Sequence, residues 1–354
     1  MRKLLRYSVL IAGVVAVMPR AAAAQVYPDR IALKERVRAV VTSYQGRTRN
    51  DEREEQTERT TRTLKLGSNG SLDLGNIAGD ITVTRGGGSD ATVEIVKVAR
   101  GLDAGDAREL LNLVTVDVTE RNGRAEVKTH YPNGDEQRRN NRRNINVSVS
   151  YNVTAPAGTR VMAESISGNI KVTEIKGEVS ASTISGDVRI TGAGHVGTAK
   201  SISGSVEIEE VKSDGSIDAS TVSGDVRLHR VSARRLSGGS VSGNVRLEDV
   251  ETGSVTAHST SGNINFVGPL ARSGRYELKS FSGEVRLTLT GNTGFEVDAN
   301  TFSGDVRCDF PITTHGTEST NRRGHRTVLH GTYGDGSAVV DITTFSGSVV
   351  IGKR

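Results

Sequence analysis

The chain has 354 residues with a single cysteine, no tryptophan, 4% aromatic residues and a formal net charge of +5 at pH 7, which gives a sequence pI of about 9.3. One cysteine excludes an internal disulfide, so packing and backbone pairing must stabilise the fold. The many glycine, serine, threonine and valine residues favour strands and tight turns over helices, and the basic excess is compatible with affinity for anionic surfaces.

Residues 1–24 have the pattern of a secretory signal peptide. A basic start over residues 1–6 is followed by an apolar run over residues 7–18 and by small residues that allow cleavage after Ala24. The run is shorter than the about 20 apolar residues that a membrane-spanning helix needs, which argues against the alternative of a membrane anchor. No cysteine near the cleavage position offers a lipid attachment point, and no second long apolar run follows. We therefore expect an exported, soluble chain that starts at Gln25 and is periplasmic, secreted or held at the cell surface.

Residues 25–62 are expected to form a charged linker. Residues 30–44 have the pattern of a short amphipathic helix. The rest of the segment contains almost no apolar residue and carries both signs of charge. Such a sequence cannot bury enough surface to offset the entropy lost on ordering, so we interpret it as solvated.

Residues 63–155 are predicted to form an N-terminal β segment with one short helix. Apolar and polar residues alternate up to residue 100, which is the period of a half-buried strand. Asp103 is a suitable N-cap for a helix with Leu110 and Leu111 on one face. Asn122-Gly123 then predicts a hairpin turn, a charged loop covers residues 135–143, and a last strand ends at Pro156.

Residues 156–354 are dominated by a repeat of the form Ser/Thr-x-Ser-Gly. Its glycines are separated by 18 to 21 residues, except for a last gap of 43 residues that holds a polar insertion near residues 313–336. A related stretch, "NIAGDITV" from Asn76, indicates that the repeat begins earlier and is interrupted by the helix-bearing region. The nine glycines of the repeat are Gly168, Gly186, Gly204, Gly224, Gly243, Gly262, Gly283, Gly304 and Gly347.

Alignment on these glycines predicts how one unit is built. Apolar residues stand two and four places after the glycine, and alanine or a larger apolar residue often stands five places before it. The residue two places before it has the same parity as the first set, so a continuous strand would put both on one face. These residues are Ile166, Ile184, Ile202, Val222, Val241, Thr260, Phe281, Phe302 and Phe345. The change of parity towards the alanine position indicates a corner between two strands.

One such unit cannot bury its apolar face alone, whereas stacked units can. We therefore predict an all-β chain: a single-chain β-solenoid, β-helix-like, of about 19–21-residue repeats, with coils about 4.8 Å apart. A β-sandwich or a propeller is the alternative, but propeller blades need about 40 residues, roughly twice this period. The glycine is expected to allow a close approach or an unusual backbone conformation.

The serial Ser-x-Ser-Gly-Asp/Asn/Glu-Val-x-Leu units, preceded by "LGNIAGDITV", a short helix and a strand ending at Ala155-Pro156, resemble the bacterial DUF4097 family, which carries an adhesin label. The resemblance covers about residues 63–354. It implies a β-helical repeat protein of the cell envelope or surface. The family has no established activity, and some of its members are associated with envelope-stress responses.

The repeated polar residues do not form a catalytic pattern. The serine before each glycine has no histidine near it in sequence, so a nucleophile is not predicted. The residues directly after the glycines are mixed and have turn-forming character: Asn169, Asp187, Ser205, Asp225, Asn244, Asn263, Glu284, Asp305 and Ser348. Cys308 takes the place of an apolar residue in sister repeats.

No metal motif occurs in the sequence, and the histidines of the insertion, His315, His325 and His330, are interpreted as bystanders. We accordingly predict no catalytic residue, no metal and no cofactor.

One row of residues is a candidate binding surface. Three places after the glycine, strand alternation directs side chains outward, and stacking would line them up along the solenoid. Such a stripe would suit an anionic polymer, because arginine matches phosphate and carboxylate geometry. The alternative, which we favour, is a solvated face on which neighbouring Asp and Glu residues pair with the arginines. Such a charged face discourages edge-to-edge aggregation. The stripe contains Arg189, Arg227, Arg246, Arg286 and Arg307, with Lys171, and is interrupted by Glu207, Asn265 and Val350.

The sequence thus predicts an exported, non-enzymatic β-solenoid protein with an adhesin-like, scaffold or binding role. An anionic glycan or another envelope component is the expected partner, with no specific nucleic acid and no membrane span in the mature chain. The alternative is a carbohydrate-active β-helix enzyme acting on an acidic polysaccharide. That alternative would need one unique cluster of acids or bases, which only the insertion near residues 313–336 could supply.

Overall fold

The computed structural model describes residues 53–132, 145–314 and 327–354. These residues belong to one structural unit, Asn50–Pro132 together with Ile145–Arg354. The signal peptide, the amphipathic helix and the charged loop predicted above lie outside the described residues, as do His315 and His325. Across the three described ranges, no helix combines the length and the hydropathy needed to cross a membrane.

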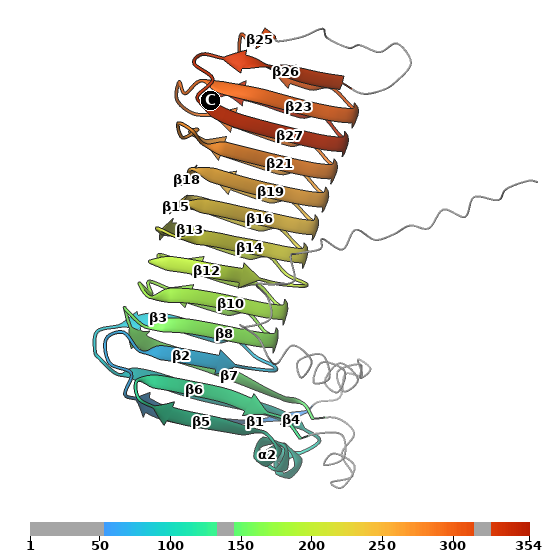
Figure 1. Cartoon of the computed structure of the whole chain (residues 1–354). Helices are drawn as coiled ribbons and strands as arrows, with labels where there is room; N and C mark the ends of the chain where they lie inside the picture. Colours follow the sequence, from blue (N-terminus) through green and yellow to red (C-terminus); the bar gives the residue numbers. More distant parts are fainter. Residues whose placement is uncertain (1–52, 133–144, 315–326) are drawn as a thin grey trace, which may run out of the picture. The chain divides into compact units, whose positions relative to one another are not determined.

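The described unit is almost entirely β and contains one helix, α2 (Ala104–Leu113), and two sheets of 14 strands each (Figure 1). Sheet A comprises β1 (Glu54–Leu64), β3 (Ile81–Gly86), β4 (Ala91–Gly101), β7 (Val147–Pro156), β9 (Ile170–Thr173), β11 (Val188–Thr191), β13 (Val206–Lys212), β15 (Val226–Ala233), β17 (Val245–Glu248), β18 (Glu251–Thr252), β20 (Ile264–Gly268), β22 (Val285–Leu289), β24 (Val306–Cys308) and β28 (Val349–Lys353).

Sheet B comprises β2 (Ser71–Gly75), β5 (Thr115–Arg121), β6 (Arg124–His130), β8 (Arg160–Ser167), β10 (Glu178–Ser185), β12 (His195–Lys200), β14 (Ser216–Ser223), β16 (Arg235–Ser242), β19 (Ser254–Ser261), β21 (Arg275–Ser282), β23 (Phe295–Ser303), β25 (Thr313–Thr314), β26 (Thr327–Tyr333) and β27 (Ala338–Ser346).

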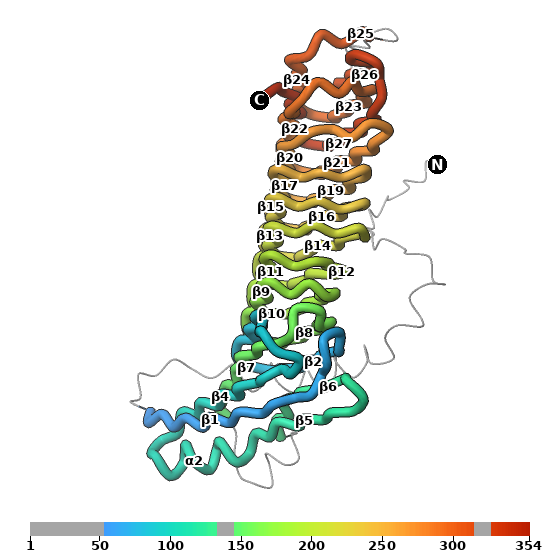
Figure 2. The backbone as a smooth tube through the Cα atoms, turned by 90° about the vertical axis from the view of Figure 1, so that its left-hand side faces the viewer, coloured from blue at the N-terminus to red at the C-terminus, as the bar shows by residue number. Residues whose placement is uncertain are grey.

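Each repeat forms one coil, which confirms the predicted β-solenoid (Figure 2). A strand of sheet B leads through the Ser-Gly corner into a strand of sheet A, as β14 leads through Gly224 into β15. Equivalent strands of successive coils pair in parallel and in register, so Val226 lies between Val206 and Val245. Equivalent side chains therefore form continuous rows along the stack.

The core lies between the two sheets and is filled by these rows. In the coil around Gly224, sheet B contributes Ala219 and Thr221, and sheet A contributes Val226 and Leu228, each at most 5% exposed. Burial of these apolar rows supplies the free energy that no disulfide provides.

The prediction that the residue two places before the glycine shares this inner face is wrong for the coils from Ile202 onwards, whereas Ile166 is buried and Ile184 half-buried. Val222 points outward and is 47% exposed, whereas Thr221 points inward. Alternation continues along β14 up to Thr221 but restarts after the Ser-Gly corner, so parity cannot be counted across the corner. The inner row contains serine or threonine, and its hydroxyls, except that of Ser165, donate to the repeat-glycine carbonyl of an adjacent coil: Thr221 Oγ1 lies 2.8 Å from the Gly204 oxygen.

The repeat glycines lie directly against one another. Gly224 has φ +152°, a value that side chains disfavour, and a Cβ there would come within 2.2 Å of the Gly204 carbonyl oxygen. Its amide donates to Ser242 O of the next coil. This close backbone contact explains why the position carries glycine in every copy of the repeat.

At both ends of the stack, the order of coils in space differs from the order in sequence. The coil of β2 and β3, which contains "NIAGDITV", pairs with β8 and β9, as expected for an early copy of the repeat. At the other end, β27 lies between β21 and β23, and β28 lies between β22 and β24. The last coil of the chain is thus inserted before the coil of β23 and β24. The antiparallel hairpin of β25 and β26 follows β23 at the edge of sheet B.

The N-terminal segment contains the predicted helix and hairpin. Helix α2 starts after Asp103, whose carboxylate accepts a hydrogen bond from Asp106 N at 2.8 Å. Strands β5 and β6 are joined by Asn122 and Gly123, both with positive φ as a type I′ turn requires.

The expected linker differs at its C-terminal end, since Glu54–Leu64 forms strand β1, which pairs with β4. Its charges make cross-strand ion pairs, such as Arg59 with Glu94 at 3.1 Å, and protect an edge strand.

Candidate functional site

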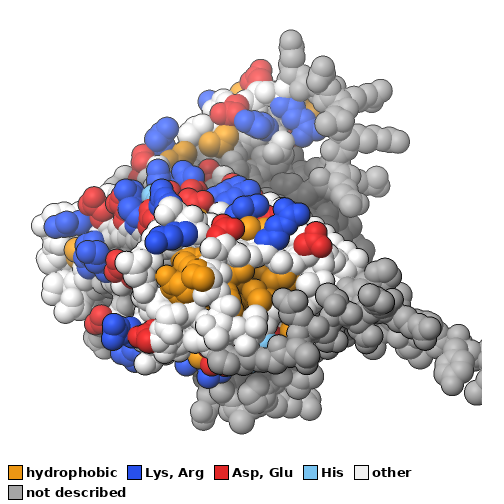
Figure 3. Space-filling model, turned by 90° about the horizontal axis from the view of Figure 1, so that it is seen from above, with side chains coloured by type: hydrophobic (Ala, Val, Ile, Leu, Met, Phe, Trp, Pro, Cys, Tyr) orange, Lys and Arg blue, Asp and Glu red, His pale blue; other side chains and the backbone are white. Residues whose placement is uncertain are grey.

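The predicted arginine row is aligned by the register of sheet A. Arg189, Glu207, Arg227 and Arg246 follow one another on adjacent strands. Each arginine of the row has a carboxylate partner: Arg189 with Glu207, Arg227 with Asp225 at 2.6 Å, Arg246 with Asp225 at 3.0 Å, Arg286 with Glu284 at 2.7 Å and Arg307 with Asp305 at 3.8 Å. In the view from above, basic and acidic side chains are interspersed (Figure 3). The five arginines thus share four carboxylates, so most of their charge is compensated locally.

Asp225 is the central acid of this row. Burial opposes its ionisation, but hydrogen bonds from Asn244 and Arg246 and the charge of Arg227 outweigh burial and hold the pKa of Asp225 below its usual value. A dip of about 220 Å³ beside Arg227 and Arg246 is also lined by Glu207, Glu209 and Glu248. An anionic polymer would meet carboxylates at each step along this surface.

A second row, which the sequence did not predict to be exposed, runs along the outer face of sheet B just before the Ser-Gly corners. We call it the apolar column. Its large members are each 47–57% exposed: Ile202, Val222, Val241, Phe281, Phe345 and Phe302. The restart of alternation at the corner directs these side chains away from the core. Thr260 interrupts the column. It lies opposite Val241, because its neighbours Ser259 and Ser261 pair with Ser240 and Ser242.

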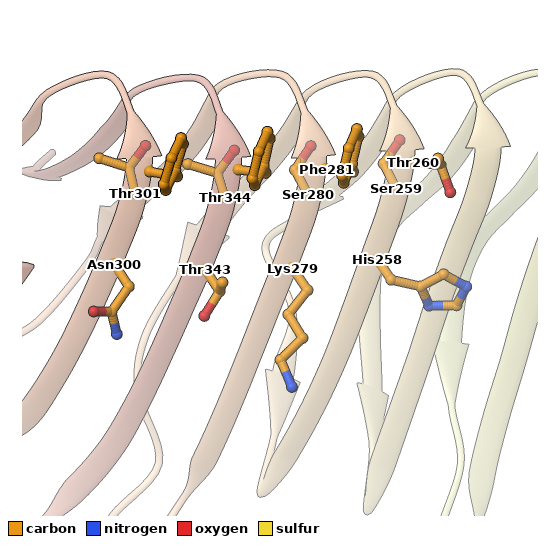
Figure 4. Close-up of a pocket in the computed structure, with 12 residues that line it drawn as sticks. His258, Ser259, Thr260, Lys279, Ser280, Phe281, Asn300, Thr301, Thr343 and Thr344 are labelled. Atoms are coloured by element: carbon orange, nitrogen blue, oxygen red, sulfur yellow. The ribbon is translucent and has the colours of Figure 1, made fainter. Parts of the chain in front are cut away.

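Three phenylalanines of the apolar column form a parallel stack. The ring centroids of Phe281 and Phe345 are 5.0 Å apart with an interplanar angle of 1°, and those of Phe345 and Phe302 are 4.8 Å apart with an angle of 3°. The insertion of β27 between β21 and β23 places Phe345 in the middle. On the other side of Phe281 the neighbouring coil carries Thr260, so that face of the ring borders a threonine (Figure 4).

A shallow trough of about 520 Å³ runs beside the stack across β19, β21, β27 and β23. Its second wall is an in-register row of His258, Lys279, Thr343 and Asn300, which we call the polar row. Figure 4 shows these side chains below the rings. The imidazole of His258 lies over Gly239 of the adjacent strand, where a Cβ would come within 2.1 Å of its Cε1 atom.

Carboxylates two residues earlier on the same strands hold three members of the polar row. Lys279 is paired with Glu277, Thr343 donates to Asp341 at 3.4 Å, and the Asn300 amide donates to Asp298. The hydrogen bond that Lys279 donates to the Glu277 carboxylate raises the pKa of Lys279. The trough therefore combines an aromatic wall with oriented hydrogen-bonding groups and a line of acids behind them.

The family model for DUF4097, described as Toastrack, matches residues 69–352. The chain belongs to the DUF4097 Toastrack family. A search of curated proteins gives no match.

Three solved structures are similar to this Toastrack chain. One is named a "putative cell adhesion protein" of Clostridium sporogenes, with 10% identity, a TM-score of 0.20 and coverage of 85% of this chain and 100% of its own. Another is a "putative lipid binding protein" of Parabacteroides distasonis, with 12% identity, a TM-score of 0.45 and coverage of 84% of this chain and 96% of its own. The third is a "putative adhesin" of Bacteroides fragilis, with 14% identity, a TM-score of 0.40 and coverage of 84% of this chain and 97% of its own. None of the three names is that of an enzyme, and the low identities and scores assign no ligand to this chain.

Cys308 and His330, the other residues considered in the sequence, both lie in the β structure near the end of the stack. Cys308 is partly buried, burial raises the pKa of its thiol, and Sγ lies 3.9 Å from Phe310 O. His330 lies on β26 opposite Asp298. Within the described ranges, no three His, Cys, Asp or Glu side chains gather in a way that would hold a metal ion.

Proposed function

We propose that this Toastrack chain is a non-enzymatic binding or scaffold protein of the cell envelope or surface, which engages its partner through the outer face of sheet B. The apolar column carries the proposal. Contiguous apolar side chains are rarely left open to water on soluble proteins, and such patches mark interaction sites. The column lies outside the core between the sheets. Its apolar side chains are therefore better explained by contact with a partner than by stabilisation of the fold.

Export is part of the proposal and rests on the pattern of residues 1–24. N-terminal sequencing of the protein from fractionated cells tests this part. We expect the envelope or secreted fraction to contain a chain that begins at Gln25, and an uncleaved chain in the cytoplasm would contradict it.

An anionic partner at the arginine row is less well supported, because every arginine there is paired with a carboxylate. An enzyme acting on an acidic polysaccharide would need a unique cluster of acids, whereas the acids of the described surface recur at equivalent places in successive coils.

Binding of the purified mature chain to washed envelope material from the producing cells, measured by sedimentation, tests the proposal. A variant with Val222→Ser, Val241→Ser and Phe281→Ser combined should bind at least about tenfold more weakly, since each buried side chain of this size contributes about 1.5–3 kcal/mol. The matched variant Arg227→Ala plus Arg246→Ala should bind like the wild type. The reverse result would assign binding to the arginine row. Turnover of a polysaccharide that one point substitution abolishes would overturn the non-enzymatic assignment.

A further inference from the structure

We propose that the trough beside the phenylalanine stack binds an uncharged saccharide chain, with one sugar ring seated against the face of Phe281 that borders Thr260. This inference rests on the proposed binding function and names the ligand class of the same face. It is carried by the interruption of the apolar column, the side chains around that interruption and the charges behind them.

The interruption at Thr260 is a notch of one coil. Val241 and Phe281 lie on strands two inter-strand spacings apart, which is about 10 Å. A ring placed over Thr260 would lie about 4.8 Å from Phe281. This distance matches the 4.8 and 5.0 Å that separate the ring centroids within the stack. A flat group of a ligand would therefore continue the stack where the chain itself has no ring.

The notch has the chemistry that a sugar ring requires. A pyranose has C–H bonds on its faces and hydroxyl groups around its rim, so it needs an apolar surface with hydrogen-bonding groups beside it. Phe281 supplies the apolar surface and Thr260 a hydroxyl beside it, while the imidazole of His258 and the ammonium group of Lys279 line the trough below the rings (Figure 4). Ligand sites generally combine an apolar wall with a few placed polar groups in this way.

The trough continues from the notch along the solenoid. Its four strands span three inter-strand spacings, or about 14 Å, and the polar row follows the rings on each of them. A saccharide chain extended along this direction would meet Thr343 and Asn300 after the notch. The geometry thus suits several linked sugars rather than a monosaccharide.

The charges favour an uncharged saccharide. Lys279 is already paired with Glu277, and Asp341 and Asp298 follow on the next two strands. Carboxylates in such a line would repel an anionic polysaccharide and would be costly to cover with a lipid acyl chain. An extended peptide could not add to the sheet here, because β21 and β27 are hydrogen-bonded on both sides.

Titration calorimetry on the soluble mature chain tests the inference. The probes are hexasaccharides of β-1,4-linked glucose and of β-1,4-linked N-acetylglucosamine, with hexagalacturonate as the acidic comparison. We expect the wild type to bind at least one neutral probe and to bind hexagalacturonate more weakly. Phe281→Ala removes the wall, and Thr260→Phe fills the notch with a fourth ring; each should weaken binding at least tenfold. Leu102→Ala, at an exposed apolar residue outside the column and the trough, should leave the affinity unchanged.

The Thr260→Phe variant separates a notch from a general apolar surface, because it adds apolar area and should keep the wild-type melting temperature. Stronger binding by the Thr260→Phe variant, an equal loss of affinity in Leu102→Ala, or a preference for hexagalacturonate would overturn the inference. Binding of a Tyr-containing hexapeptide at Phe281, with no neutral saccharide bound, would also overturn it. Failure of both neutral probes while envelope material still binds through the column refutes the saccharide and leaves the proposed function standing, whereas loss of envelope binding refutes both.

Discussion

The ring of Phe345 lies parallel to the ring of Phe302 with their centroids 4.8 Å apart, although the two residues belong to different coils separated by the β25–β26 hairpin. The contact exists because the last coil of the chain, β27 and β28, is inserted between two earlier coils. The end of the chain therefore builds both the core and the exposed stack.

Deletion of residues 338–354 should disorganise the end of the stack. The deletion leaves β21 and β23 without the strand that pairs with both, and removes the buried side chains of Val340 and Ile342. We expect hydrogen exchange to show loss of amide protection in β21–β24 while β10–β14 stay protected. Deletion of Arg354 alone should change little. Retained protection in β23 after the longer deletion would contradict the insertion.

Gly224→Ala should destabilise the fold by about 3 kcal/mol, because the backbone there has φ +152° and the added Cβ would collide with the Gly204 carbonyl. Urea denaturation followed by circular dichroism measures the change. Gly253→Ala is the matched control, since the nearest atom to its Cβ would be 3.7 Å away. Equal stabilities for the two variants would refute the close glycine contact.

Thr221→Val should cost about 1–2 kcal/mol, because it removes the hydroxyl that donates to Gly204 O and leaves that carbonyl without this partner in the interior. Thr221→Ser keeps the hydroxyl and reproduces the residue found at Ser201 and Ser240, so it should be tolerated better. The same denaturation experiment decides, and a valine variant as stable as the serine variant would show that the hydroxyl row is dispensable.

Asp225→Asn should reduce stability at neutral pH more than in acid. The pKa of Asp225 is lower in the folded chain than in the unfolded one, so its contribution is present above the usual value of 3.8 and is lost as the pH falls through the folded value. Comparison of urea midpoints at pH 7 and pH 3 should show the difference between wild type and variant shrinking in acid. Asp305→Asn, an exposed acid 3.8 Å from Arg307, should show little change at either pH. A difference that grows in acid would reverse the assignment.

Much of the fold could be predicted from the sequence because the repeat is regular. The glycine period, the inner valine rows, the Asp103 cap and the Asn122-Gly123 turn all depend on local patterns. The outward position of Val222 could not be obtained by counting parity, since alternation restarts at the Ser-Gly corner. The invariable serine or threonine at Thr221 and its equivalents was the available signal that this row, and not its apolar neighbour, faces inward.

Two other features depend on contacts that the sequence does not specify. Near-identical repeats carry no record of their order in space, so the position of β27 between β21 and β23 was not predictable. The charges of residues 54–62 suggested a solvated linker, but Arg59 and its neighbours pair across to β4. The notch at Thr260 exists because the residues of the apolar column point outward, and the sequence alone did not predict that direction.

Thiol labelling tests the outward apolar column most directly. In a Cys308→Ala background, a single cysteine is introduced by Val222→Cys, by Phe281→Cys or, as the buried control, by Val226→Cys, and its reaction with a maleimide is followed in the native chain. We expect the first two to react at the rate of an exposed thiol, to be slowed by bound envelope material, and the third to react only on unfolding. A cysteine at position 222 that stays unreactive until the chain unfolds would place the column inside the solenoid and remove the surface on which the proposed binding depends.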